Sequence, residues 1–73
     1  MPSINTAEDA VNAAERFVGK YHPLRELQRV VREGDKWVTE FDVGVLSTKI
    51  VRVTLDAQTG NVIEYGQIGE SGH

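Results

Sequence analysis

The stretch from residue 51 to residue 65 constrains the fold most, because it has the pattern of two strands joined by a tight turn. Its first half alternates apolar and polar side chains, which is the period of a strand with one buried and one solvated face. Asp56 can accept hydrogen bonds from backbone amides downstream, and Gly60 tolerates a positive φ. We therefore predict a β-hairpin in which Asp56 and Gly60 are turn residues rather than ligands of a metal or a phosphate.

An amphipathic helix is predicted upstream of this hairpin, over residues 6–20. Apolar side chains recur there at intervals of three and four residues, which places on one stripe Ala7, Ala10, Val11, Ala14, Phe17, Val18 and Tyr21. Asn5 or Thr6 provides the N-cap, with an acidic residue three positions later in either register. The helix should end before Pro23, since the residue preceding a proline avoids the α region.

Between the helix and the hairpin, residues 37–46 alternate as a strand with Trp37 and Phe41 on the face that meets the helix. Gly44 marks a bulge or a close approach by another backbone. Residues 24–33 fit either a short helix or a strand. The compact polar turn at residues 33–36 favours the strand, which would span residues 27–33. The Gly-rich residues 67–73 are predicted to form a flexible tail.

The predicted fold is therefore α+β. An N-terminal helix packs on one face of a four-stranded antiparallel meander over residues 27–33, 37–46, 49–56 and 61–66, so that residues 1–66 form one domain. At 73 residues the chain buries only about 60% of its unfolded surface, and a core of this size often needs the help of a partner subunit.

Composition excludes several classes of function. The net charge of −3 argues against nucleic-acid binding, which requires a strongly basic face. The chain has no cysteine and therefore no disulfide or thiolate metal site. It contains no apolar run of membrane-spanning length and no signal-peptide pattern, so we predict no membrane span and favour a cytoplasmic location.

No motif indicates an enzyme, a cofactor or a metal site. His22 and His73 are the only histidines, and two imidazoles without cysteines do not complete a zinc site. Glu40 and Asp42 project from one strand face, where a pair of carboxylates is usually part of a solvated sheet surface rather than an acid–base couple.

The face of the sheet that the helix leaves open is the predicted interaction surface. We place on it Val38, Glu40, Asp42, Ile50 and Arg52. The functional hypothesis is a non-catalytic interaction or regulatory module that binds a protein partner, or itself as a homodimer, through this face or an edge strand. The alternative is a small-molecule-binding domain or minimal enzyme that uses a pocket between helix and sheet, lined at one end by Tyr21, His22, Trp37 and Tyr65.

The order of these elements and the hairpin residues resemble the PepSY domain. The segment from Leu55 to Val62, Leu-Asp-Ala-Gln-Thr-Gly-Asn-Val, is similar to the terminal hairpin of that family, and residues 37–43 stand where the family has its aromatic-rich second strand. The resemblance implies a helix on an antiparallel sheet and a non-catalytic module, often attached to peptidases or cell-envelope proteins, that inhibits or regulates proteases. The chain also resembles the gas vesicle accessory protein of the O type, which is similar in its helix, its Trp-Val strand and its late Leu-Asp hairpin.

Overall fold

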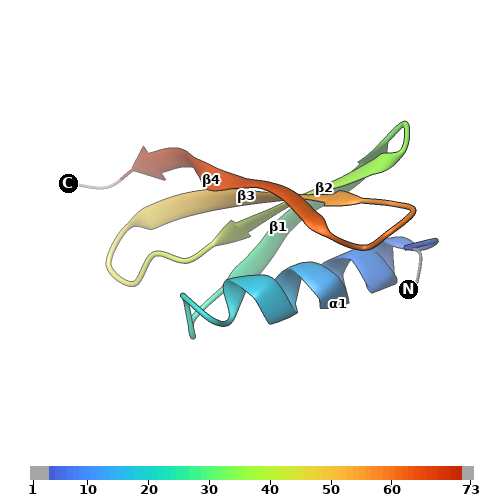
Figure 1. Cartoon of the computed structure of the whole chain (residues 1–73). Coiled ribbons are helices and arrows are strands. Elements are labelled where there is room, and N and C mark those ends of the chain that lie inside the picture. Colours follow the sequence, from blue (N-terminus) through green and yellow to red (C-terminus); the bar gives the residue numbers. More distant parts are fainter. Residues whose placement is uncertain (1–3, 72–73) are drawn as a thin grey trace.

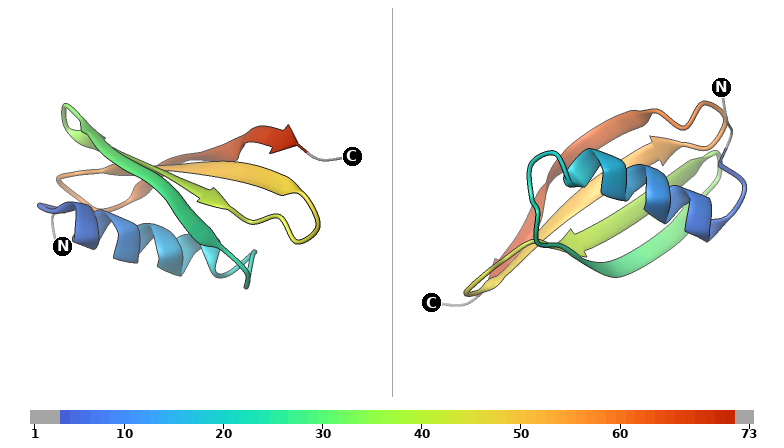
Figure 2. Two further views of the ribbon diagram at one scale, coloured as in Figure 1. Left: turned by 180° about the vertical axis from the view of Figure 1, so that it is seen from behind. Right: turned by 90° about the horizontal axis from the view of Figure 1, so that it is seen from below.

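The computed structural model describes residues 4–71 and consists of one helix followed by four strands. Helix α1 spans Ala7–Val18, and the strands are β1 (Glu26–Glu33), β2 (Lys36–Asp42), β3 (Thr48–Asp56) and β4 (Val62–Ser71). The strands form one antiparallel sheet in the order β1-β2-β3-β4, and α1 lies across one face of it (Figures 1 and 2). The predicted α+β meander is confirmed.

Helix α1 is anchored to the sheet by small side chains at every fourth position. Ala10, Ala14 and Val18 are completely buried, because short side chains allow the helix to approach the strands closely. Thr6 is the N-cap, and its hydroxyl accepts from the amide of Asp9 at 3.1 Å. The helix ends two residues earlier than predicted, since the amides of Lys20 and Tyr21 donate to carbonyls only three residues back and tighten the last turn.

The first hairpin settles the open assignment of residues 24–33 in favour of a strand. Strand β1 pairs with β2 through Glu33 and Lys36, and Gly34 takes a φ of 64° in the turn between them. The register shifts between Leu27 and Arg29, so that Gln28 forms a bulge in this edge strand.

Strand β2 ends at Asp42, four residues before the predicted end. Oδ1 of the Asp42 carboxylate accepts from the amides of Gly44 at 2.9 Å and of Lys49 at 3.2 Å. These bonds close a turn where a longer strand was predicted. A Cβ placed on Gly44 would lie 1.6 Å from the carbonyl oxygen of Ser47, so the predicted close backbone approach at Gly44 is confirmed. Val45 and Leu46 lie in the exposed loop that follows.

The hairpin between β3 and β4 has the predicted turn chemistry. Oδ1 of Asp56 accepts from the amides of Gln58 at 2.7 Å and of Thr59 at 3.2 Å. Gly60 has a φ of 77°, and its amide donates to the Asp56 carbonyl at 2.8 Å. These bonds satisfy backbone groups within the turn, so both residues have the structural role that was predicted.

Strand β4 is longer than predicted, because residues 67–71 belong to it instead of to a flexible tail. Gln67 pairs with Val51, and Ser71 pairs with Thr48 at the start of β3. Strand β3 has nine residues, and the first four of them, residues 48–51, pair with residues 67–71. The backbone of residues 67–71 therefore supplies the hydrogen-bond partners that this part of β3 needs. Residues 72 and 73 of the predicted tail lie outside the described part of the chain.

The core lies between α1 and the sheet. Its largest fully buried side chains are those of Phe41, Leu55, Val18, Val53 and Thr39. The hydroxyl of Thr39 donates to the carbonyl of Val53 at 3.0 Å, so this polar group is buried with its hydrogen bond made. At the N-terminal end of the helix, Nε1 of Trp37 donates to the carbonyl of Ile4 at 3.0 Å.

Replacing Trp37 by Phe should lower the free energy of unfolding by about 1–2 kcal/mol, because it leaves the Ile4 carbonyl without its donor in a buried setting. Urea denaturation followed by far-UV circular dichroism measures the change. Tyr21→Phe is the control, since it also removes a donor from an aromatic ring, but at an exposed position. Equal midpoints for the two variants would contradict a structural role for the Trp37 hydrogen bond.

Candidate functional site

The register of the sheet brings all five predicted surface residues onto the face opposite α1. Glu40 pairs with Arg52, and Asp42 pairs with Ile50, while Val38 lies opposite Thr54. The alternate positions of β2 and β3 carry the core residues, so this second face is the one that the helix leaves open (Figure 1).

The centre of the open face is an ion-pair cluster. Oε2 of Glu40 accepts from Nη1 of Arg29 at 3.4 Å, and from Nε and Nη2 of Arg52 at 3.3 and 3.2 Å. The Glu40 side chain is only 13% exposed, whereas both arginines are about half exposed. Two cations therefore share one anion, and the cluster carries a net positive charge.

The apolar residue nearest the ion-pair cluster, Val38, is largely covered. Val38 is only 7% exposed although no helix covers it, and it lines a 170 Å³ hollow together with the long side chains of Arg29, Lys36 and Arg52. The aliphatic parts of such long side chains cover apolar surface while their charged ends remain in water. Asp42, with its carboxylate engaged in the turn after β2, has a structural role. The open face is thus charged rather than apolar.

Replacing Glu40 by Gln should destabilise the protein by less than about 1 kcal/mol, because its arginine partners are solvated and exposed ion pairs contribute little. The loss should shrink further at 1 M salt, where such pairs are screened. Glu33→Gln is the control, because it changes an exposed carboxylate of β1 that has no ion pair among the described residues. Thermal melts of the two variants measure the difference in stability. A loss of several kcal/mol would show that the cluster holds the sheet together.

The two edges of the sheet differ in how they are protected. Edge strand β1 carries four charged residues, Glu26, Arg29, Arg32 and Glu33. Edge strand β4 has a single charged residue, Glu64, between positions 62 and 69, and three large apolar side chains are exposed there, those of Ile63 at 49%, Tyr65 at 36% and Ile68 at 45%. Charged side chains discourage pairing at a sheet edge, so β4 is the edge that is open to another strand.

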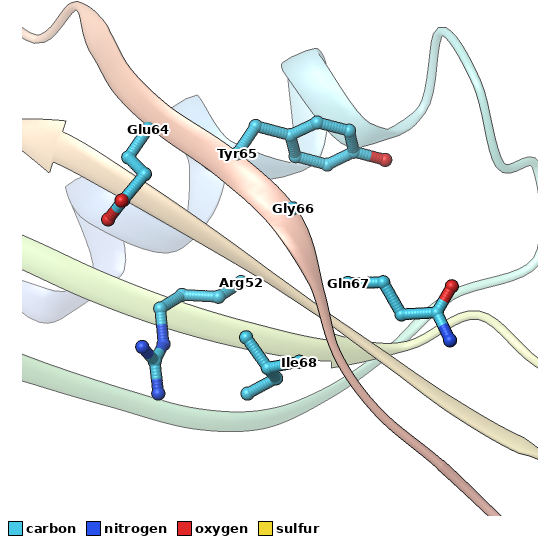
Figure 3. A pocket seen from close by; sticks show the side chains of 6 residues that line it. All are labelled: Arg52, Glu64, Tyr65, Gly66, Gln67 and Ile68. Atoms are coloured by element: carbon cyan, nitrogen blue, oxygen red, sulfur yellow. The ribbon is translucent and has the colours of Figure 1, made fainter.

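A hollow of 230 Å³ lies along β4 at Gly66 (Figure 3). Arg52, Glu64 and Ile68 border it on one side of the strand, while Tyr65 and Gln67 point to the other side. The hollow exists because Gly66 has no side chain, and a Cβ built there would meet nothing within 4 Å. Gly66 also has no positive φ, so neither backbone conformation nor crowding requires glycine at this position.

An aromatic cluster fixes β4 to the end of α1. The ring of Phe17 contacts Tyr65 edge to face at a centroid distance of 5.0 Å and Tyr21 at 5.5 Å, while Tyr21 and Tyr65 stack at 6.0 Å. Burial raises the pKa of the Tyr65 hydroxyl above 10.0, and the neighbouring Tyr21 adds to the rise. The cluster holds the middle of β4 in place from the helix side.

The four residues predicted to line a gap between helix and sheet are not brought together. Tyr21 and Tyr65 stack near the C-terminal end of α1, whereas Trp37 lies at the other end of the helix beside Ile4. The His22 amide donates to the carbonyl of Val18 as part of the helix end. The alternative small-molecule function therefore lacks the site on which it was based.

Sequence reasoning named an edge strand as a possible interface, but it did not say which edge and did not extend the last strand beyond residue 66. The prediction ends the last strand at residue 66, although Gln67 and Ile68 continue an extended pattern and Ile68 is a good strand former. Uncharged residues from 65 to 69, next to a strand already predicted, were the available signal.

No group of three or more His, Cys, Asp or Glu side chains within residues 4–71 is arranged to hold a metal ion. Over the same residues, no helix has both the length and the apolar character needed to cross a membrane. Comparison of the chain with protein-family models, with curated proteins and with solved structures finds no match.

Proposed function

We propose that this protein is a non-catalytic interaction module that accepts an extended protein segment along the outer edge of β4. The observation that carries the proposal is the contrast between the charged β1 edge and the β4 edge, where residues 62–69 have one charge and three exposed apolar side chains. Strand addition gives affinity through backbone hydrogen bonds and specificity through side chains that alternate between the two faces.

Two further features support the edge over the open face as the binding site. The arginines of the open face are already engaged by Glu40, and Val38 is largely covered, so a partner would have to displace ion pairs to reach apolar surface. The hollow at Gly66, by contrast, has free volume directly beside the edge. The resemblance to the PepSY domain, whose helix and antiparallel sheet have the same order, is consistent with a regulatory module without catalysis.

A selection from a displayed library of random twelve-residue peptides tests the proposal. Isotope-labelled protein is titrated with the enriched peptides, and the expected result is amide shifts concentrated at residues 64–68. Ile68→Lys should weaken binding at least about tenfold, since lysine on an edge strand opposes pairing. Gln28→Lys on β1 is the matched control and should bind as the original protein does.

The outcome that would contradict the proposal is equally specific. A selection that enriches no peptide, or peptides whose shifts map to β1 or α1 and whose binding is unaffected by Ile68→Lys, would show that the β4 edge does not accept an added strand.

A further inference from the structure

The charges on β4 are complementary to those beside the β4 edge of a second copy of the chain. We infer that β4 of a second copy is added to β4, antiparallel about a two-fold axis at Tyr65, so that Glu64 of each copy reaches Arg52 of the other across Gly66. This inference rests on the proposed role of the β4 edge and names the partner segment.

The segment available for regular pairing is short and well defined. The register between β3 and β4 shifts at two places, which leaves Ile63 and Ile68 as extra residues in bulges. Residues 64–67 between them are regularly paired with β3 and present a regular outer edge. A second strand therefore pairs best with these four residues.

Charge decides the register of the two copies. An axis at Glu64 would place two carboxylates directly opposite each other, and an axis at Gly66 would align Arg52 of one copy with Arg52 of the other across two glycines. An axis at Tyr65 places Glu64 of the second copy opposite Gly66, whose neighbour in β3 is Arg52. Of these three arrangements, only the axis at Tyr65 brings opposite charges together.

The groups that would meet are suited to each other. Arg52 belongs to a cluster in which two arginines share Glu40, so positive charge remains for a further anion. Glu64 has no ion pair within residues 4–71. Two strand spacings, about 10 Å, separate Arg52 from Glu64 of the second copy, and the two extended side chains together bridge that distance over the hollow.

Gly66 has a role in this arrangement that the single chain does not explain. Its missing side chain leaves the volume in which the carboxylate of the second copy would lie. On the opposite face, the two Tyr65 rings come directly opposite each other, and aromatic cross-strand pairs stabilise a sheet. The two-fold axis makes the contact between Glu64 and Arg52 occur twice, as in an isologous dimer.

Sedimentation equilibrium of the full chain up to millimolar concentration is the first test, and a reversible dimer is expected. Glu64→Gln should raise the dissociation constant roughly tenfold, because each dimer loses two ion pairs. Gly66→Val should abolish the dimer by filling the hollow, while its melting temperature at low concentration stays equal or rises. Glu33→Gln on β1 is the charge-matched control and should leave the dimer unchanged.

Single cysteine substitutions test the register, since the chain has no cysteine of its own. Two copies of Tyr65→Cys would place their Cα atoms about 4.5–5.5 Å apart at the axis, within reach of a disulfide. A cysteine introduced by Ile63→Cys would lie opposite Gln67 of the second copy. The introduced cysteine of that copy would be four residues, about 13 Å, further along the strand. Mild oxidation should therefore couple the Tyr65→Cys variant covalently and leave the Ile63→Cys variant uncoupled.

A strict monomer at every concentration, a dimer insensitive to Glu64→Gln and Gly66→Val, or equal coupling of the two cysteine variants would each overturn the inference. If displayed peptides still bind at residues 64–68 of such a protein, the β4 edge accepts a foreign segment and only the second copy as partner is wrong. If neither peptides nor a second copy bind there, the proposed function fails as well.

Discussion

Phe41→Ala should lower the free energy of unfolding by about 3–5 kcal/mol, which is the usual cost of removing a buried phenylalanine ring. The Phe41 side chain is completely buried between Leu27 and Val51 on the helix face of β2. A protein of 73 residues has a total stability of only about 4–11 kcal/mol, so this loss is a large share of it and should lower the denaturation midpoint strongly.

Guanidinium denaturation followed by circular dichroism at 222 nm measures this loss. Leu46→Ala is the control, because it removes a large apolar side chain that is 99% exposed, and it should change the free energy of unfolding by less than about 0.5 kcal/mol. A Phe41→Ala variant that unfolds at the same midpoint as the control would mean that the sheet does not pack on α1 as described.

Gly44→Ala should be the most damaging of the glycine replacements, with a loss of about 3 kcal/mol. The new Cβ would lie 1.6 Å from the carbonyl oxygen of Ser47 and 3.0 Å from the amide of Lys49, so the backbone of the turn has to move. That movement also disturbs the hydrogen bond from the Gly44 amide to Asp42 and the start of β3.

Gly66→Ala provides the matched control, because the same chemical change is made where a Cβ meets nothing within 4 Å. Removing a glycine from a strand reduces the entropy of the unfolded chain, so this variant should be more stable by about 0.4–1 kcal/mol. Thermal melts of both variants give the difference directly. If the two replacements shift the melting temperature alike, the close backbone approach at Gly44 is not part of the folded protein.

The features predicted correctly from the sequence are those that local chemistry determines. The turn at Asp56 and Gly60 depends on one carboxylate, two nearby amides and one positive φ, all within one short segment. The stripe of α1 likewise follows from a spacing of three and four residues along one segment.

The features that were missed depend on contacts between distant segments. Residues 67–71 are a strand because the first half of β3 has backbone groups that need partners, and the weak strand pattern at Gln67 and Ile68 is interrupted by glycines on both sides. The bulge at Gln28 was also missed, and it places Leu27 instead of Gln28 opposite Phe41 on the helix face of the sheet. A one-residue bulge of this kind has no reliable signature in sequence.

The meander has a consequence for the order of folding. Its strands pair only with their neighbours in the chain, so each hairpin closes a short loop and forms from local contacts. The bonds from Ile4 to Ala57 and from Trp37 to Ile4 join segments that are far apart in sequence, and their closure entropy makes them late steps. Weakening this N-terminal attachment should therefore accelerate unfolding and leave the refolding rate nearly unchanged.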